Sequence, residues 1–243
     1  RTFPDARELS HQTLISGLTS PKFKQDIVDL FRSNRFAQTT ALEIGAGYGT
    51  TTAALAVNFG TVVATEVFWE VDKPWGEVDL TSTDFPAASQ RGFGFHLDAR
   101  RLFKRDGSSF NNIVKLHMDA KLPFGLSVLV EQNISAAVID AQHDFFNVVG
   151  ETMSVLRYIP CCVETIVYHD YCNYNVYGAI QFFVDAGLLA FRKHMGLSTF
   201  KDYKCTGSSL PEGVAMRVLR HSAGFWSRLE TLYGQYMSNP LYP

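Results

Sequence analysis

The chain has 243 residues, of which 46% are hydrophobic and 13% aromatic, which is ample for a substantial core and excludes a disordered protein. Its 22 basic and 24 acidic residues give a formal net charge of -2, so we expect no nucleic-acid partner, which normally requires a basic surface. No apolar run approaches the roughly 20 residues that cross a bilayer, so we expect no membrane partner either.

Strand and helix patterns alternate along the chain. An N-terminal helical segment, residues 1–38, contains a helix predicted from about Pro21 to Arg32, because Ser20 suits an N-cap and proline suits the first turn. Apolar or β-branched runs then predict buried strands at 41–45, 61–67, 112–118, 135–141 and 163–170. Helical spacing of apolar residues is found at 144–158 and 175–186. This alternation is typical of an α/β protein with a doubly wound, mostly parallel sheet that binds its ligand at the carboxyl ends of the strands.

The C-terminal part of the chain has a different pattern. Strand-like segments at 188–196 and 212–219 lie too close together for a crossover helix, so we expect them to pair antiparallel at one edge of a seven-stranded sheet. The segment 224–237 has apolar residues at helical spacing, and it either closes the domain or pairs two subunits as a homodimer. We therefore expect a single domain over residues 1–243.

One segment interrupts the alternation. The stretch between Glu66 and Asn112 is about twice as long as a crossover helix needs. Its first part, an insertion at about 67–95, is rich in turn-forming and aromatic residues, including Trp69 and Trp75. Two interpretations remain open: a surface excursion held in place by the two tryptophans, or a lid over the ligand site.

The four cysteines give no sign of a disulfide framework. They are Cys161, Cys162, Cys172 and Cys205, and no two of them have CxxC spacing. We expect buried free thiols. We also expect a cytoplasmic protein, although the sequence starts at Arg1 and leaves open a targeting segment upstream.

The stretch ALEIGAGYGTTTAAL, residues 41–55, places three glycines where a strand gives way to a helix. Glycine reaches positive φ and allows a ligand to lie against the backbone, and a helix N-terminus offers N–H groups to an anionic or polar ligand. The turn therefore predicts a nucleotide-like cofactor. The glycines are Gly45, Gly47 and Gly49, whereas a dinucleotide-binding turn has GxGxxG or GxGxxA spacing, so the pattern disfavours NAD without excluding it.

The stretch LEIGAGYGTTT resembles the first motif of class I S-adenosylmethionine-dependent methyltransferases, in which an acidic residue stands two positions before the first glycine, as Glu43 does. The resemblance implies a Rossmann-like methyltransferase fold with S-adenosylmethionine as cofactor. Acids at three further strand ends agree with it: Glu66 for the ribose hydroxyls, Asp119 for the adenine amino group, and Asp140 between cofactor and acceptor. The cofactor-binding residues it implies are Glu43, Gly45, Ala46, Gly47, Gly49, Thr50, Glu66, Val67, Asp119, Ala120 and Asp140.

Two later stretches narrow the resemblance. VIDAQHDFFNVVGETMSVL and ETIVYHDYCNYNVYGAIQFF are similar to a branch that includes the macrolide-sugar O-methyltransferases and is distantly related to the catechol type. Phe145 stands where this branch usually has tyrosine. The similarity covers roughly residues 38–190, and it implies methyl transfer to a hydroxyl of a sugar, a polyol or a phenol.

The branch also implies residues that act in catalysis. Its metal-dependent members would place magnesium or manganese on Asp140, His169 and Asp170, but they favour a carboxylate where this chain has His169. A histidine ligand shifts the preference towards manganese, iron or zinc, and both a metal-assisted and a metal-free mechanism remain open. Three roles remain open for His169: a metal ligand, a second base, or a residue that only packs at the end of its strand. His143 is the candidate base, because imidazole titrates near neutrality. The alternative is that His143 only forms a hydrogen bond with Asp140.

The sequence therefore predicts an S-adenosylmethionine-dependent O-methyltransferase that acts on a small hydroxylated molecule. Two alternatives remain. A catalytically silent, methyltransferase-like binding module would keep the cofactor pocket but would not need His143, His169 and Asp170. An NAD-dependent oxidoreductase would bind NAD and would leave Asp140 and His143 without an obvious role.

Overall fold

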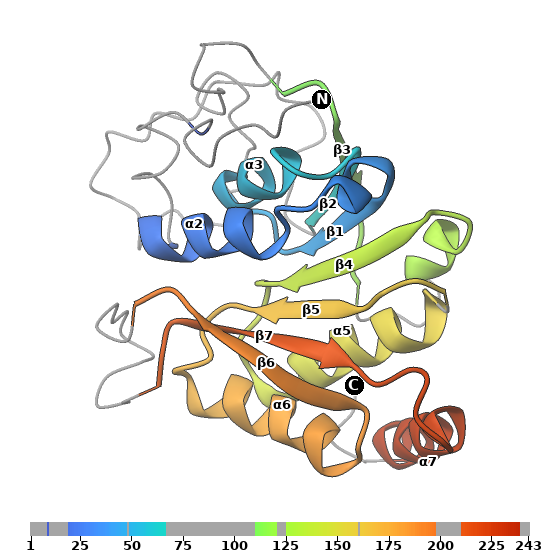
Figure 1. Cartoon of the computed structure of the whole chain (residues 1–243). Helices are drawn as coiled ribbons and strands as arrows, with labels where there is room; N and C mark the ends of the chain where they lie inside the picture. The colour runs from blue at the N-terminus through green and yellow to red at the C-terminus, as the bar shows by residue number, and fades with distance from the viewer. Residues whose placement is uncertain are drawn as a thin grey trace.

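A seven-stranded sheet runs through the centre of the protein (Figure 1). The computed structural model describes residues 9, 19–47, 49–66, 110–120, 125–159, 161–197 and 210–238. The predicted insertion at 67–95, with Val67 at its start, lies outside these residues. The strands are β1 (Thr40–Ile44), β2 (Thr61–Glu66), β3 (Ile113–His117), β4 (Ile134–Ile139), β5 (Thr165–Tyr168), β6 (Leu189–Met195) and β7 (Gly213–Val218).

The strand order β3-β2-β1-β4-β5-β7-β6 confirms the predicted α/β, doubly wound, mostly parallel sheet. Strands β1 to β5 are parallel, and β7 pairs antiparallel with both β5 and β6, as the C-terminal pattern predicted. Because β7 runs antiparallel to β5, its first residues lie beside the last residues of β5, and Val214 is opposite Tyr168. Residues just before β7 therefore reach the edge at which β4 and β5 end.

Helices cover both faces of the sheet. They are α2 (Pro21–Leu30), α3 (Thr50–Ala56), α5 (Phe145–Tyr158), α6 (Tyr174–Asp185) and α7 (Phe225–Met237), with short 3-10 helices η2 (Asn34–Gln38) and η3 (Gly125–Leu129). On β4, Ala136 and Val138 join the core formed with α2 and α3, whereas Ala137 and Ile139 join the core formed with α5, α6 and α7. Burial on both faces explains why these strands are continuous apolar runs rather than alternating ones.

Helix α7 closes one side of the second of these cores. Its residues Phe225, Leu229 and Leu232 are buried, while Trp226 remains 44% exposed. The predicted homodimer stays a prediction.

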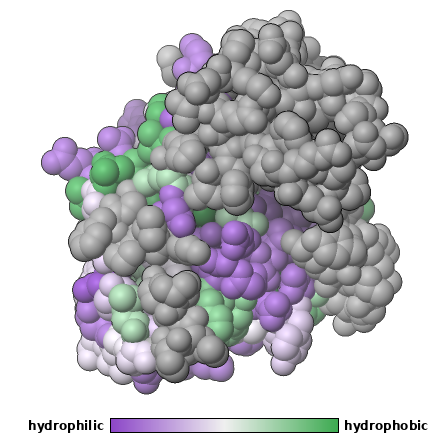
Figure 2. All heavy atoms as spheres, turned by 180° about the vertical axis from the view of Figure 1, so that it is seen from behind, coloured by the Kyte–Doolittle hydropathy of each residue, from purple (hydrophilic) through white to green (hydrophobic). Residues whose placement is uncertain are grey.

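Seen from the side opposite to Figure 1, the described surface has a broad hydrophilic area at its centre, with smaller hydrophobic patches beside it (Figure 2). Among the described helices, none has the length and apolar character needed to cross a membrane.

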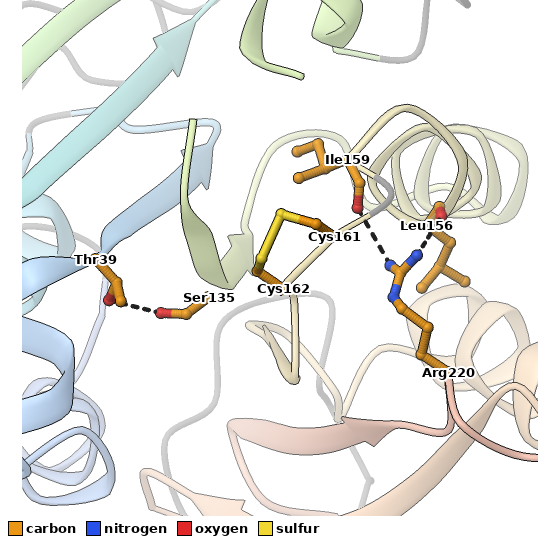
Figure 3. The surroundings of a disulfide bond; sticks show 7 residues. All are labelled: Thr39, Ser135, Leu156, Ile159, Cys161, Cys162 and Arg220. Atoms are coloured by element: carbon orange, nitrogen blue, oxygen red, sulfur yellow. Dashed lines mark hydrogen bonds between the residues drawn. A yellow bond between two sulfur atoms is a disulfide. The ribbon is translucent and has the colours of Figure 1, made fainter. Parts of the chain in front are cut away.

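The expectation of free cysteines is wrong for the cysteines that the structure describes. Cys161 and Cys162 are exposed and form a disulfide with each other in the turn between α5 and β5 (Figure 3), and Cys172 is also disulfide-bonded. The two cysteines are consecutive in the chain, and Cys162 has a positive φ of 75°. A search for CxxC spacing cannot detect this pairing.

Candidate active site

The glycine turn after β1 has the backbone conformation that its sequence predicts. Gly45, Gly47 and Gly49 have φ values of 82°, 48° and 75°. A Cβ on Gly45 would overlap the carbonyl oxygen of Asp140 and the backbone of Ala141, so only glycine allows the ends of β1 and β4 to lie this close. At Gly47 no described residue lies within 4 Å of the Cβ position, so among the described residues the backbone angle alone favours glycine there.

A pocket with an empty volume of about 360 Å³ lies next to this turn, at the carboxyl ends of the first four strands. It is lined by Ile44, Gly45, Thr65, Glu66, Met118, Asp119, Ala120, Ala141, Gln142, Asn147 and Glu151. Four predicted cofactor residues, Gly45, Glu66, Asp119 and Ala120, are therefore brought together. The carboxylate of Glu66 accepts a hydrogen bond of 3.3 Å from the N–H of Gly47, which joins the turn to the end of β2.

Of the other predicted cofactor residues that the structure describes, none lines the pocket. Ala46 and Thr50 are buried. Glu43 is fully buried on β1, where one carboxylate oxygen accepts a hydrogen bond from the hydroxyl of Thr52 on α3 and the other has no hydrogen-bond partner. Burial, with the nearby charge of Asp140, raises the pKa of Glu43 well above its usual value although the Thr52 hydroxyl opposes this. Glu43 therefore links β1 to α3.

Glu151 on α5 is a pocket residue that the sequence interpretation missed. It is 5% exposed, and one of its carboxylate oxygens has no hydrogen-bond partner. Burial raises its pKa well above the usual value, assisted by the negative charge of Asp119 and opposed by His143. The sequence did carry a signal, because Glu151 lies on the same helix face as the buried Val148 and Val155.

Two histidines and two aspartates meet beside this pocket, after β4 and β5. Asp140, His143, His169 and Asp170 each offer one ligand atom, and these four atoms lie within 4.8 Å of one another. Nε2 of His143 is 2.8 Å from Asp170 Oδ2 and 3.5 Å from Asp140 Oδ1. Nδ1 of His169 is 2.9 Å from Asp140 Oδ1 and 3.4 Å from Asp170 Oδ2. The structure thus brings together all the residues predicted for catalysis and for the metal.

The four ligand atoms are close enough together to hold one cation. Nδ1 of His169 is buried and makes no hydrogen bond of acceptable direction, although two carboxylate oxygens lie within 3.4 Å. Ligand atoms that are neighbours around one divalent ion are separated by roughly 3 Å, because metal–ligand bonds are about 2.0–2.2 Å long. The side chains of this cluster therefore fit a cation.

The other ring nitrogen of His169 contacts Glu212, a second residue that the sequence interpretation missed. Nε2 of His169 is 3.1 Å from Glu212 Oε1, and Glu212 is 0% exposed. Glu212 immediately precedes β7, and the antiparallel direction of that strand brings it to the ends of β4 and β5. The ring of His169 also packs edge-on against Phe23 of α2, at 5.0 Å between ring centroids.

The carboxylates control the protonation of both histidines. Burial alone would lower the pKa of His143, but its hydrogen bonds to Asp140 and Asp170 and their charges outweigh burial and raise the pKa to about 9. The pKa of His169 is likewise raised well above its usual value, against burial, chiefly by the charge of Asp140. The histidines in turn hold the pKa of Asp170 far below its usual value, although burial opposes this. The imidazole of His143 is therefore cationic at neutral pH when no metal is bound, and the same carboxylates favour the charged form of His169.

This protonation predicts a pH dependence of stability in chelator-treated protein. The pKa of His143 is about 9 in the folded state against 6.5 ordinarily, so its contribution is fully present below pH 6.5 and is lost as the pH rises through 9. We expect it to amount to about 1–3 kcal/mol. Urea unfolding of the wild type and of His143→Gln at pH 6, 7.5 and 9 measures it as the difference between the two proteins.

The comparison with His143→Gln is needed because another buried group has the opposite effect. Burial lowers the pKa of Lys24 to about 8, although the charge of Glu212 opposes this, and the cost of burying its charge therefore falls as the pH rises above 8. This effect is the same in both proteins and cancels in the difference. A difference that does not change between pH 6 and pH 9 would contradict the ion pairs of His143.

Comparison with known proteins supports the fold. No protein-family model matches the sequence, and no curated protein is significantly similar to it. The structure is similar to that of the O-methyltransferase NovP, with a TM-score of 0.53 and 12% identity over 82% of this chain and 80% of NovP. It is also similar to cofactor-bound Rv0187 from MTB, with a TM-score of 0.50 and 16% identity over 89% of this chain and 85% of that one. Together with the strand order, these similarities show that the chain has a Rossmann-like methyltransferase fold.

Proposed function

We propose that this protein is an S-adenosylmethionine-dependent O-methyltransferase that acts on a small hydroxylated molecule. The observation that carries the proposal is the position of the pocket containing Glu66 and Asp119 directly beside the cluster of two histidines and two aspartates. A methyltransferase needs such a pair of adjoining sites, because the methyl donor and the acceptor hydroxyl must be aligned before transfer. A sugar, polyol or phenol is the proposed acceptor on the sequence resemblance alone.

The residues around the pocket suit the cofactor. Glu66 and Asp119 end or follow neighbouring parallel strands and both line the pocket, so their carboxylates can accept hydrogen bonds from ribose hydroxyls and an adenine amino group. Gly45 lies in the wall with no side chain, which leaves its backbone open to the ligand. Glu151 adds a buried carboxyl group to the pocket wall, and burial raises its pKa, which favours the protonated form that can donate a hydrogen bond.

The residues of the cluster suit a divalent cation, and Asp140, His143, His169 and Asp170 would hold it. Two imidazoles and two carboxylates favour manganese, iron or zinc over magnesium, which prefers ligands that are all oxygen. A divalent ion bound there would lower the pKa of an acceptor hydroxyl and fix its direction. Because Asp140 follows β4 and its backbone contacts Gly45, the cluster is held at a fixed distance from the cofactor turn.

The cluster also defines what His143 can do. As a base it must first be neutral, and the pKa of about 9 keeps it protonated at neutral pH in the metal-free protein. A cation between the four side chains would displace this proton, and both imidazoles would then serve as ligands. We therefore assign His143 to metal binding when a cation is present, and to base catalysis only in a metal-free protein above its pKa.

Calorimetric titration with S-adenosylmethionine, S-adenosylhomocysteine and NAD tests the cofactor assignment. We expect micromolar binding of the first two, and at least about tenfold weaker binding in Glu66→Ala, because hydrogen bonds to a charged carboxylate are lost. Glu131→Ala removes an exposed carboxylate elsewhere in the chain and should bind as the wild type does. Binding of NAD alone would favour the oxidoreductase, and cofactor binding without methyl transfer to any hydroxylated acceptor would favour the silent binding module.

A further inference from the structure

The buried carboxylate of Glu212 accepts hydrogen bonds from Ser20 and Leu197 and contacts the ring of His169. Oε1 accepts from the backbone N–H of Ser20 at 2.6 Å and lies 3.1 Å from Nε2 of His169. Oε2 accepts from the hydroxyl of Ser20 and from the N–H of Leu197 at 3.3 Å. The residue is 0% exposed, and a Cβ on the neighbouring Gly196 would overlap its carboxylate. The side chain is therefore fixed in one orientation by donors from three parts of the chain.

This arrangement determines which nitrogen of His169 carries a proton. The N–H and O–H donors of Ser20 and the N–H of Leu197 already point at the Glu212 carboxylate, so its oxygens act as acceptors, and we infer that Nε2 donates its hydrogen to Oε1. The lone pair of the neutral ring is then on Nδ1, the nitrogen that faces Asp140 and Asp170. Nδ1 and two carboxylate oxygens thus direct electron pairs at the same region, an arrangement that a cation stabilises.

We propose that Glu212 is a positioning residue, which holds His169 in the tautomer that presents Nδ1 to a divalent transition metal such as manganese, iron or zinc. The inference rests on the metal-binding part of the proposed function and adds to it a residue that does not touch the metal. A carboxylate that accepts the second ring hydrogen of a histidine ligand fixes the orientation of the ring, and its loss commonly weakens metal binding by about 10–100-fold.

Cobalt(II) is a suitable probe, because its visible spectrum reports the ligands around it and its affinity can be measured without cofactor or acceptor. We expect Glu212→Ala to bind cobalt about 10–100-fold more weakly than the chelator-treated wild type and to show a changed cobalt spectrum. Glu212→Gln is the conservative variant. An amide oxygen in place of Oε1 still accepts from His169 and from the N–H of Ser20, so we expect most of the affinity and the wild-type spectrum to return.

Asn58→Ala controls for a general loss of stability. The side chain of Asn58 is buried and donates to the carbonyl of Val28 on α2, so its removal destabilises the same helix region without contact with His169. Its cobalt affinity should equal that of the wild type. Equal affinities for Glu212→Ala and wild type, or an equal loss in Asn58→Ala, would overturn the proposal.

A measurement on the wild type alone keeps the test valid if Glu212→Ala does not fold. Nitrogen-15 NMR of the zinc-loaded protein distinguishes the two ring nitrogens of His169, and we expect a hydrogen on Nε2 and the metal on Nδ1. The reverse assignment would overturn the proposal. Failure of the proposed function gives different results, because a wild type that binds no cobalt lacks the metal site itself, and one that binds no S-adenosylhomocysteine lacks the cofactor site.

Discussion

Asp170→Asn is expected to weaken the binding of a divalent cation by about 100-fold or more and to abolish methyl transfer. The carboxylate of Asp170 is 4% exposed and contacts both imidazoles of the cluster, at 2.8 Å from His143 and 3.4 Å from His169. Loss of a residue that only supports a ligand commonly costs about 10–100-fold, so loss of a charged ligand should reach at least the upper end. The variant also removes the charge that stabilises both imidazolium groups before the metal binds.

The substitution tests charge without disturbing the backbone. Asp170 has a positive φ of 50°, a conformation that asparagine tolerates better than most residues. Asp144→Asn is the matched control, because Asp144 caps α5 through the N–H of Asn147 and asparagine caps a helix equally well. Manganese titration, methyl-transfer assays and S-adenosylhomocysteine affinity should be measured for both variants. The cofactor affinity should be unchanged in each, and retained transfer in Asp170→Asn would contradict a role for this carboxylate.

Gly45→Ala is expected to destabilise the protein by about 2–5 kcal/mol and to remove cofactor binding. The added Cβ would overlap the carbonyl oxygen of Asp140 and the backbone of Ala141, and the residue would keep a φ of 82°. Overpacking costs about 1–3 kcal/mol and a left-handed conformation about 1–2 kcal/mol. Relief of the overlap would move Asp140 away from the cluster, so the metal affinity should fall as well.

Gly47→Ala separates the effect of the steric overlap from the effect of the left-handed backbone conformation. Gly47 also has a positive φ, 48°, but no part of the chain that the structure describes lies within 4 Å of its Cβ position, so we expect only the cost of the backbone conformation. We expect a loss of about 1–2 kcal/mol and an unchanged affinity for metal. Urea unfolding and manganese titration of the two variants compare them directly. Equal losses of stability and of metal affinity at both positions would show that contact between the ends of β1 and β4 is unimportant.

The sequence predicted most of the site because its residues follow parallel strands. Glu66, Asp119, Asp140 and Asp170 each end or follow a β-branched run, and parallel strands end at one edge of the sheet. Periodicity predicted where the strands end, and the resemblance to class I methyltransferases implied that these acids bind the cofactor or the acceptor. The resemblance also implied such a role for Glu43, but the alternating direction of side chains along β1 sends Glu43 towards α3, where it accepts a hydrogen bond from Thr52.

The parts that sequence reasoning missed depend on contacts between distant segments. Glu212 stands before its strand rather than after it, and only the antiparallel direction of β7 brings it beside His169. Ser20 joins the same network from the other end of the chain, through the cap of α2. No spacing rule connects residues that are separated in this way, because their proximity is set by strand order, which one sequence does not specify.

The disulfide between Cys161 and Cys162 has a consequence for the stoichiometry of metal binding. It lies at the start of β5, while His169 and Asp170 follow the end of the same strand, so the two sites are separated by the length of β5. Reduction would convert the exposed disulfide into two neighbouring thiols, and thiolates are soft ligands that compete strongly for zinc and cobalt. Metal titrations of protein kept in a thiol reductant would then include ions held by these thiolates, so ions bound at the proposed cluster should be counted in oxidised protein.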